Sequence, residues 1–144
     1  MSENVDLALK IIDAVNRGED VFDLGLVAPD FAFVSPPEAL EPGIRRGREG
    51  WRQVVERLED SYESSHVDVE RIFEDGDRVI LLSVFRVRGR GSGMEIADDA
   101  GYVLTLRDGL GVRMEWYIGH ERTLRATGID PQRANTPQDT AGAE

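Results

Sequence analysis

The stretch RVILLSVFRVRGRGSGMEIADDAGYVLTLRDGLGVRMEWYI, residues 78–118, decides the fold of this chain. It contains three strand-like runs separated only by turns, at 79–87, 94–106 and 112–118. The first connection is rich in glycine, and the second begins with Asp108-Gly109. An Asp-Gly pair favours a hairpin because glycine accepts the positive φ that such turns need. The stretch therefore predicts an antiparallel meander of three strands.

The two faces of this meander differ in polarity. Side chains alternate between faces along a strand, so every second residue shares a face. One face of the second and third strands is largely apolar and is the predicted core face, formed by Ile96, Asp98, Ala100, Tyr102, Leu104, Leu106, Met114, Trp116 and Ile118. The other face is mixed, and we expect it to be solvated or to meet another subunit; it carries Asp99, Gly101, Val103, Thr105, Arg113, Glu115 and Tyr117.

The elements before the meander are mostly helical. Apolar residues at helical spacing predict helices over about 5–17, 20–27 and 48–61. A short strand is expected at 30–34 and a loop at 38–47, while imperfect alternation over 66–73 predicts a strand with a bulge. Helices followed by a run of strands and a last helical turn indicate an α+β fold, with helices covering one face of an antiparallel sheet.

One domain is predicted over residues 1–129, since a chain of 144 residues suits a single core. Residues 130–144 contain no large apolar side chain, so we expect them to form a disordered C-terminal tail.

Composition excludes several classes of function. The formal net charge of −11 disfavours nucleic acid and anionic membrane surfaces as partners, because both attract local positive charge. The chain has no cysteine, which excludes disulfides and thiolate chemistry. Its apolar runs are too short to cross a bilayer and no secretory signal is visible, so a cytoplasmic protein is expected. Neither of the two histidines, His66 and His120, stands at a metal-binding spacing, so no metal site is predicted.

Three motifs carry a resemblance to a known family. They are the glycine-rich turn at 89–93, Arg107-Asp108-Gly109, and Tyr117 followed by the ending LRATGI at 124–129. In these features the chain resembles a SnoaL-like domain of the nuclear-transport-factor-2-like superfamily. The resemblance implies a cone-shaped barrel, in which a curved antiparallel sheet wraps around about three N-terminal helices and encloses an apolar chamber.

The same resemblance implies a range of activities. Relatives act as isomerases, cyclases, dehydratases and epoxide hydrolases without cofactors, and their shared device is a carboxylate in an apolar pocket. By this resemblance the chain is expected to bind a small hydrophobic molecule, to need no cofactor, and to form a homodimer through the outer sheet face that carries Val103, Thr105 and Tyr117.

The candidate catalytic residues are Asp98, Tyr102 and His120, which we expect to face the chamber. Asp98 is proposed as base or acid and Tyr102 as donor to a developing oxyanion. The alternative is that Asp98 lies in water and that Tyr102 packs with its hydroxyl satisfied. For His120, which Glu121 follows, the alternative is a place at the start of a surface helix. The predicted pocket wall consists of Phe33, Trp51, Leu104, Met114, Trp116 and Ile118.

A rival hypothesis is a non-catalytic module of the same fold that binds a ligand or dimerises. Many SnoaL-like sequences carry an acid before the aromatic of the first strand and another after the last strand, whereas this chain has Ala32 and Gly119 there. The first predicted helix also contains no tyrosine.

Overall fold

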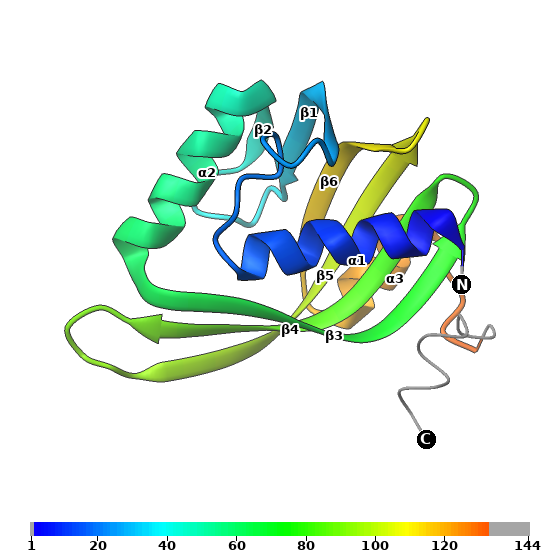
Figure 1. Ribbon diagram of the computed structural model, residues 1–144. Coiled ribbons are helices and arrows are strands. Elements are labelled where there is room, and N and C mark those ends of the chain that lie inside the picture. The colour runs from blue at the N-terminus through cyan, green and yellow to red at the C-terminus, as the bar shows by residue number, and fades with distance from the viewer. Residues whose placement is uncertain (1, 133–144) are drawn as a thin grey trace.

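The computed structural model describes residues 2–132 as three helices and one curved, six-stranded sheet (Figure 1). In chain order the elements are α1 (Glu3–Asn16), β1 (Val27–Ser35), β2 (Gly43–Arg46), α2 (Gly47–Ser61), β3 (Tyr62–Asp75), β4 (Arg78–Gly89), β5 (Glu95–Arg107), β6 (Leu110–Ile118) and α3 (His120–Thr127). The predicted α+β class and the curved sheet are confirmed. The meander appears as β4, β5 and β6, and the bulge in the preceding strand is present between Val69 and Arg71 of β3.

The strand order is β2-β1-β6-β5-β4-β3, so β2 and β3 are the free edges of the sheet. The expectation of a purely antiparallel sheet is wrong at one place, because β1 pairs with β6 in parallel. Parallel neighbours need a long crossover connection, and here the chain from β2 to β5 supplies it.

The predicted helix over 20–27 is also wrong, since residues 21–25 form turns and β1 begins at Val27. The carboxylate of Asp20 accepts hydrogen bonds from the backbone of Phe22 and Asp23, at 2.8 and 3.4 Å. This is the arrangement of a helix N-cap, and a single turn does follow it, since the N–H of Leu24 donates to the carbonyl of Asp20 at 3.1 Å. Gly25, at φ 69°, then turns the chain into β1. The predicted loop at 38–47 likewise contains the short edge strand β2.

The main core lies on the concave side of the sheet. In Figure 1, α1 crosses in front of the long strands, and α2 stands beside β1 and β2. Buried residues at helical spacing on α1, among them Val5, Ala8 and Ile12, pack with the sheet in one cluster. Asn16 ties the end of α1 to β3, because its side chain exchanges two hydrogen bonds with the backbone of Val67, at 2.8 and 2.9 Å.

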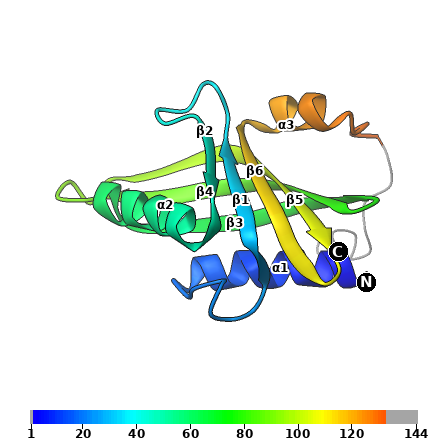
Figure 2. The same cartoon turned by 90° about the horizontal axis from the view of Figure 1, so that it is seen from above.

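The convex side is covered by α3, which lies across the sheet from α1 (Figure 2). A second core cluster forms there and contains Phe73, Ile80, Leu82, Val103 and Ile129. Val103 is only 1% exposed, so this part of the outer face is covered by the chain itself. None of the helices in the described region is long and apolar enough to cross a membrane.

The proposed domain end at residue 129 coincides with a buried side chain, since Ile129 packs in the second cluster. Most of the predicted tail, from residue 133 onward, lies outside the described residues.

The close approach of α3 to β5 depends on a glycine. A Cβ on Gly101 would stand 1.8 Å from Oγ1 of Thr123, far inside contact distance. We therefore expect Gly101→Ala to displace α3 and to lower the free energy of unfolding by about 1–3 kcal/mol, as overpacking of a core does. Urea unfolding measures this as a lower midpoint.

The control is Ala97→Ser, which adds one atom at an exposed position on the same strand and face. It is expected to change the free energy of unfolding by less than about 0.5 kcal/mol. Equal midpoints for Gly101→Ala and wild type would contradict the tight α3–β5 contact.

Candidate functional site

The predicted pocket residues meet on the concave side of the sheet. Tyr102 stands opposite Trp116, and Leu104 stands opposite Met114, which in turn neighbours Phe33. Trp51 reaches this layer from α2, and its ring meets the ring of Phe33 edge to face at a centroid distance of 5.6 Å. Most of these side chains pack together in the main core cluster. At this level the interior of the cone is filled by the protein itself.

The concave face becomes accessible toward the β4–β5 hairpin. We call this region the open end of the cone, and it is formed by Phe85, Ile96, Asp98, Trp116 and Ile118. Phe85 and Trp116 are half-buried, whereas Ile118 is 43% exposed. The indole of Trp116 is held in place, because its Nε1 donates to Oγ of Ser35 at 2.9 Å.

Tyr102 has a buried hydroxyl without a partner. The residue is 7% exposed, and among residues 2–132 its hydroxyl forms no hydrogen bond. The other buried polar side chains, Ser83, Thr123 and Thr127, each donate to a backbone carbonyl. Unpaired buried polar groups are rare in folded proteins, and each invites an explanation. Burial also raises the pKa of Tyr102, so its phenol stays protonated and remains a hydrogen-bond donor.

Asp98 shares the face of Tyr102 but is exposed to solvent. Four residues along a strand separate their Cα atoms by about 13 Å. Asp98 therefore lies in water in the free protein, as the alternative for this residue supposed. The alternative for Tyr102, a packed side chain with a satisfied hydroxyl, does not hold, because this hydroxyl has no hydrogen-bond partner within the described residues.

His120 lies away from the other two candidates. It is the first residue of α3, on the convex side, and its Nε2 is 2.7 Å from the carbonyl oxygen of Ser83. The sheet therefore separates His120 from Asp98 and Tyr102. The alternation of side chains along β6 does not extend to His120, because the chain turns at Gly119, where φ is 86°.

Two residues that shape the open end, one within it and one beside it, were missed by the sequence analysis. Phe85 stands opposite Asp98 on β4, and Ser35 holds Trp116. Alternation along the first meander strand places Phe85 on the core face, so parity could have found it. The role of Ser35 depends on the parallel pairing of β1 with β6, which no local pattern indicates.

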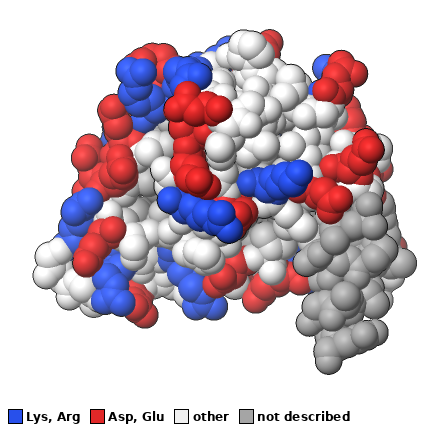
Figure 3. All heavy atoms as spheres, in the orientation of Figure 1, with Lys and Arg blue, Asp and Glu red and all other residues white. Residues whose placement is uncertain are grey.

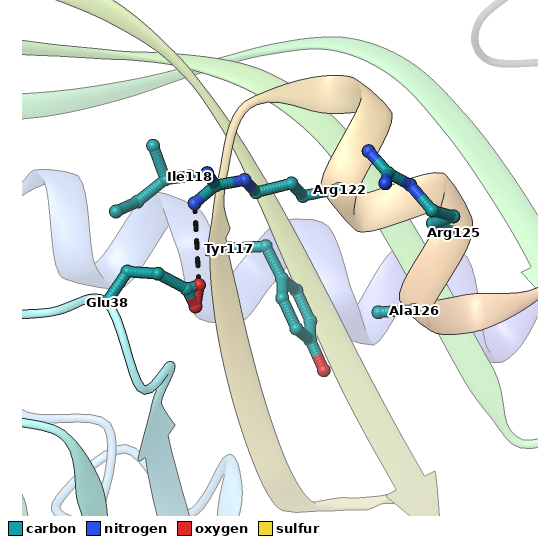
Figure 4. A pocket seen from close by; sticks show the side chains of 6 residues that line it. All are labelled: Glu38, Tyr117, Ile118, Arg122, Arg125 and Ala126. Carbon is teal, nitrogen blue, oxygen red and sulfur yellow. Dashed lines mark hydrogen bonds and ion pairs between the residues drawn. The ribbon is translucent and has the colours of Figure 1, made fainter.

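Two grooves lie on the outside of the cone. One of about 390 Å³ is lined by Glu38, Tyr117, Ile118, Arg122, Arg125 and Ala126 (Figure 4). Arg122 reaches Glu38 at 3.4 Å, and the Tyr117 hydroxyl donates to Glu115 at 2.8 Å. Burial and this hydrogen bond raise the pKa of Tyr117 to about 12. The polar groups of this groove are thus largely satisfied by one another.

The second groove, of about 200 Å³, is lined by charged and amide side chains of α2, β2 and the loop before β2: Glu41, Arg45, Gln53, Glu56, Arg57 and Asp60. Basic and acidic side chains are interspersed over the face seen in Figure 3, without a continuous basic surface.

Comparisons with known proteins agree with this geometry. The sequence profile described as "SnoaL-like domain" matches residues 8–114. None of the curated protein sequences matches this chain.

Three solved structures illustrate the likeness in fold. An NTF2-like protein of unknown function from Burkholderia pseudomallei has 19% identity and a TM-score of 0.72, covering 87% of this chain and 97% of its own. TerC, co-crystallised with polyporic acid, has 21% identity and a TM-score of 0.72, covering 89% and 98%. A protein with a ketosteroid isomerase-like fold from Catenulispora acidiphila, in complex with trimethylamine, has 20% identity and a TM-score of 0.58, covering 76% and 82%.

We expect Tyr102→Phe to leave the free energy of unfolding unchanged or to raise it by up to about 3 kcal/mol, because the substitution loses no hydrogen bond of the described residues and removes an unsatisfied buried donor. The variant also tests the raised pKa of Tyr102. Above pH 10 the unfolded chain releases the phenol proton while the native chain keeps it, so native stability falls until the pH passes the native pKa. Urea unfolding between pH 9 and 11 should show a shallower fall for Tyr102→Phe. An identical fall in both proteins would contradict the burial of this phenol.

Proposed function

The chain belongs to the SnoaL-like domain family, and from that premise we propose that it binds a small hydrophobic carbonyl compound at the open end of the cone. The observation that carries this proposal is the buried, unpaired hydroxyl of Tyr102. A ligand oxygen that accepts from this hydroxyl recovers the free energy that an unsatisfied buried donor costs, about 1–3 kcal/mol.

The surroundings suit an apolar ligand with one polar atom. Phe85 and Trp116 provide aromatic surface on either side of β5, and the Ser35 contact fixes the Trp116 ring. Mostly apolar pockets with a few fixed polar groups are typical of small-molecule sites. Solved proteins of this fold hold polyporic acid and trimethylamine, which supports a small molecule as the ligand here.

Acid–base chemistry without a cofactor follows from the same residues. The Asp98 carboxylate removes a proton from the carbon beside the ligand carbonyl, and the electron pair moves onto the carbonyl oxygen. Tyr102 donates a hydrogen bond to the resulting enolate oxygen. In a ligand with a carbon–carbon double bond next to the deprotonated carbon, the enolate is a dienolate. The proton then returns from Asp98 to the far carbon of that double bond, the carbonyl re-forms, and the double bond moves into conjugation with it, which completes an isomerisation. A ligand against Phe85 and Trp116 would cover Asp98 and exclude water from its carboxylate.

A non-catalytic ligand-binding module is the second candidate, and the exposure of Asp98 in the free protein favours it. Ala32 and Gly119, which replace the acids found in many relatives, point the same way. The two candidates differ in one measurable respect, since only the enzyme moves a proton.

The proposed homodimer must avoid the surface that α3 covers. Val103 is buried under α3, so the convex surface proposed for a second copy is the groove that Tyr117 lines beside α3. Light scattering tests this proposal, because a homodimer has twice the mass of one chain, and the mass of a single chain would contradict it.

The binding test uses a matched pair of ligands, an acetylnaphthalene and the corresponding ethylnaphthalene, which lacks the carbonyl oxygen. The chain's two tryptophans, Trp51 and Trp116, report binding by fluorescence quenching. We expect Tyr102→Phe to weaken the ketone by about 5–10-fold, the value of one hydrogen bond, and to leave the hydrocarbon unchanged. Tyr117→Phe, on the convex side, is the control and should bind both ligands as wild type does. If Tyr102→Phe binds the ketone as tightly as wild type does, the proposal that Tyr102 donates a hydrogen bond to the ligand is wrong.

The same ketone separates enzyme from binding module. In D₂O, an enzyme exchanges the methyl protons of the acetyl group, and NMR follows their loss. Exchange that depends on protein and disappears in Asp98→Asn supports the acid–base reading. If the ketone binds but its methyl protons do not exchange with D₂O, the non-catalytic ligand-binding module is supported instead.

A further inference from the structure

We propose a binding site for a divalent transition-metal ion on the convex side of the sheet, formed by Glu70, Asp99 and His120. One ligand atom from each of these side chains lies within 4.8 Å of the others. The three residues come from β3, β5 and α3, so the fold itself brings them together. Their distances along the chain explain why sequence spacing indicated no metal site.

The bulge in β3 places the first ligand. Val69 pairs with Ser83 and Arg71 pairs with Leu82, which leaves Glu70 between them without a partner in register. Bulges re-aim side chains in this way, and they recur next to functional sites. Asp99 reaches the same region from β5, where it pairs with Val84 of the strand that lies between β3 and β5.

The position of His120 is fixed from two directions. The backbone N–H of Gly119 donates to the carbonyl of Asp99 at 2.9 Å, which joins the start of α3 to the strand that carries the second ligand. Nε2 of His120 lies 2.7 Å from the carbonyl oxygen of Ser83, so in the neutral ring this nitrogen carries the hydrogen and donates it. Nδ1 then keeps a lone pair. A metal-binding histidine typically donates its other N–H to a carbonyl in this manner.

The charges at this position are unbalanced. Within residues 2–132, the carboxylates of Glu70 and Asp99 have no hydrogen bond or ion pair, although both stand within 4.8 Å of each other. The nearby carboxylate of Asp68 is instead paired with Arg86 and His66. Two like charges at this separation repel one another, and a bound cation turns the repulsion into attraction.

The donor atoms select the class of ion. One imidazole nitrogen and two carboxylate oxygens suit Zn²⁺ and its transition-metal neighbours, whereas Ca²⁺ and Mg²⁺ favour oxygen alone. Three protein ligands leave at least one position for water. The site lies across the sheet from Tyr102, so it shares no side chain with the proposed ligand site.

The experiment uses the full chain after treatment with a chelator, titrated with zinc chloride in a calorimeter. We expect one ion per chain, and we expect Glu70→Gln, Asp99→Asn and His120→Gln each to weaken the affinity at least 10-fold. Two matched controls should bind as wild type does. Asp98→Asn removes the adjacent acid on the opposite face of β5, and His66→Gln removes the other histidine of the chain.

The melting temperature provides a second readout, because the ion joins β3, β5 and α3 and binds only the folded chain. Zinc should raise the melting temperature of wild type and of both controls, and not that of the three ligand variants. Calcium chloride at the same concentration should have no effect. Failure of wild type to bind zinc below millimolar concentration, or equal affinity in Asp99→Asn and Asp98→Asn, would overturn the proposal. Circular dichroism confirms that each variant compared is folded.

Discussion

The alternation of side chains along β5 is the constraint on which both sides of this domain depend. Residues 100–104 are all buried, because α1 and the main core lie on one side of them and α3 lies on the other. A shift of one residue in register would exchange the two sets of side chains, placing Gly101 in the core and Tyr102 under α3. Neighbouring residues of β5 therefore belong to different sites. Asp98 faces the open end of the cone, whereas Asp99 faces the convex surface.

The two faces are closed in different ways. On the concave side, α1 packs a stripe of aliphatic side chains into the curve of the sheet, and α2 adds Trp51. On the convex side a short helix is sufficient, because Gly101 lets Thr123 approach the strand directly. Thr123 bonds within its own helix, to the carbonyl of Gly119 at 2.8 Å, so its close contact leaves no buried donor unsatisfied. The hairpin end of the sheet extends beyond both layers (Figure 1), which is why Asp98 is exposed while Tyr102 is not.

Local patterns predicted most of the fold. The turn at Asp108-Gly109, the parity of β5 and the bulge in β3 are all properties of neighbouring residues, and all are present in the structure. The failures concern where a helix ends and which distant segments pair. The predicted helix at 20–27 stops after one turn at Gly25, where φ is 69°, and the parallel β1–β6 pair forms between segments far apart in the chain.

The candidate site was harder to predict for the same reasons. Parity identified Tyr102 and its neighbours, but burial decides which polar group is left without a partner, and burial depends on α1 and α2. His120 was predicted to face the chamber because it comes just after the last strand of the meander. The turn at Gly119 places it on the opposite face of the sheet. Asp99 was assigned correctly to the outer face, yet its meeting with Glu70 requires the strand order of the whole sheet.

Polar groups without partners lie on both faces of the sheet. The Tyr102 hydroxyl lacks an acceptor, and the Glu70 and Asp99 carboxylates lack a cation within the described residues. The buried hydroxyl lowers the stability of the free protein, whereas the two carboxylates are exposed to water and repel one another. The two proposals differ accordingly, since a neutral donor in an apolar layer suits an acceptor on a hydrophobic molecule, while exposed anions beside an imidazole suit a metal ion. Because the sheet separates the two, a ligand at either one stabilises the same folded state without touching the other. Any effect of one ligand on the other must then pass through β5, the strand that contributes a side chain to both sites.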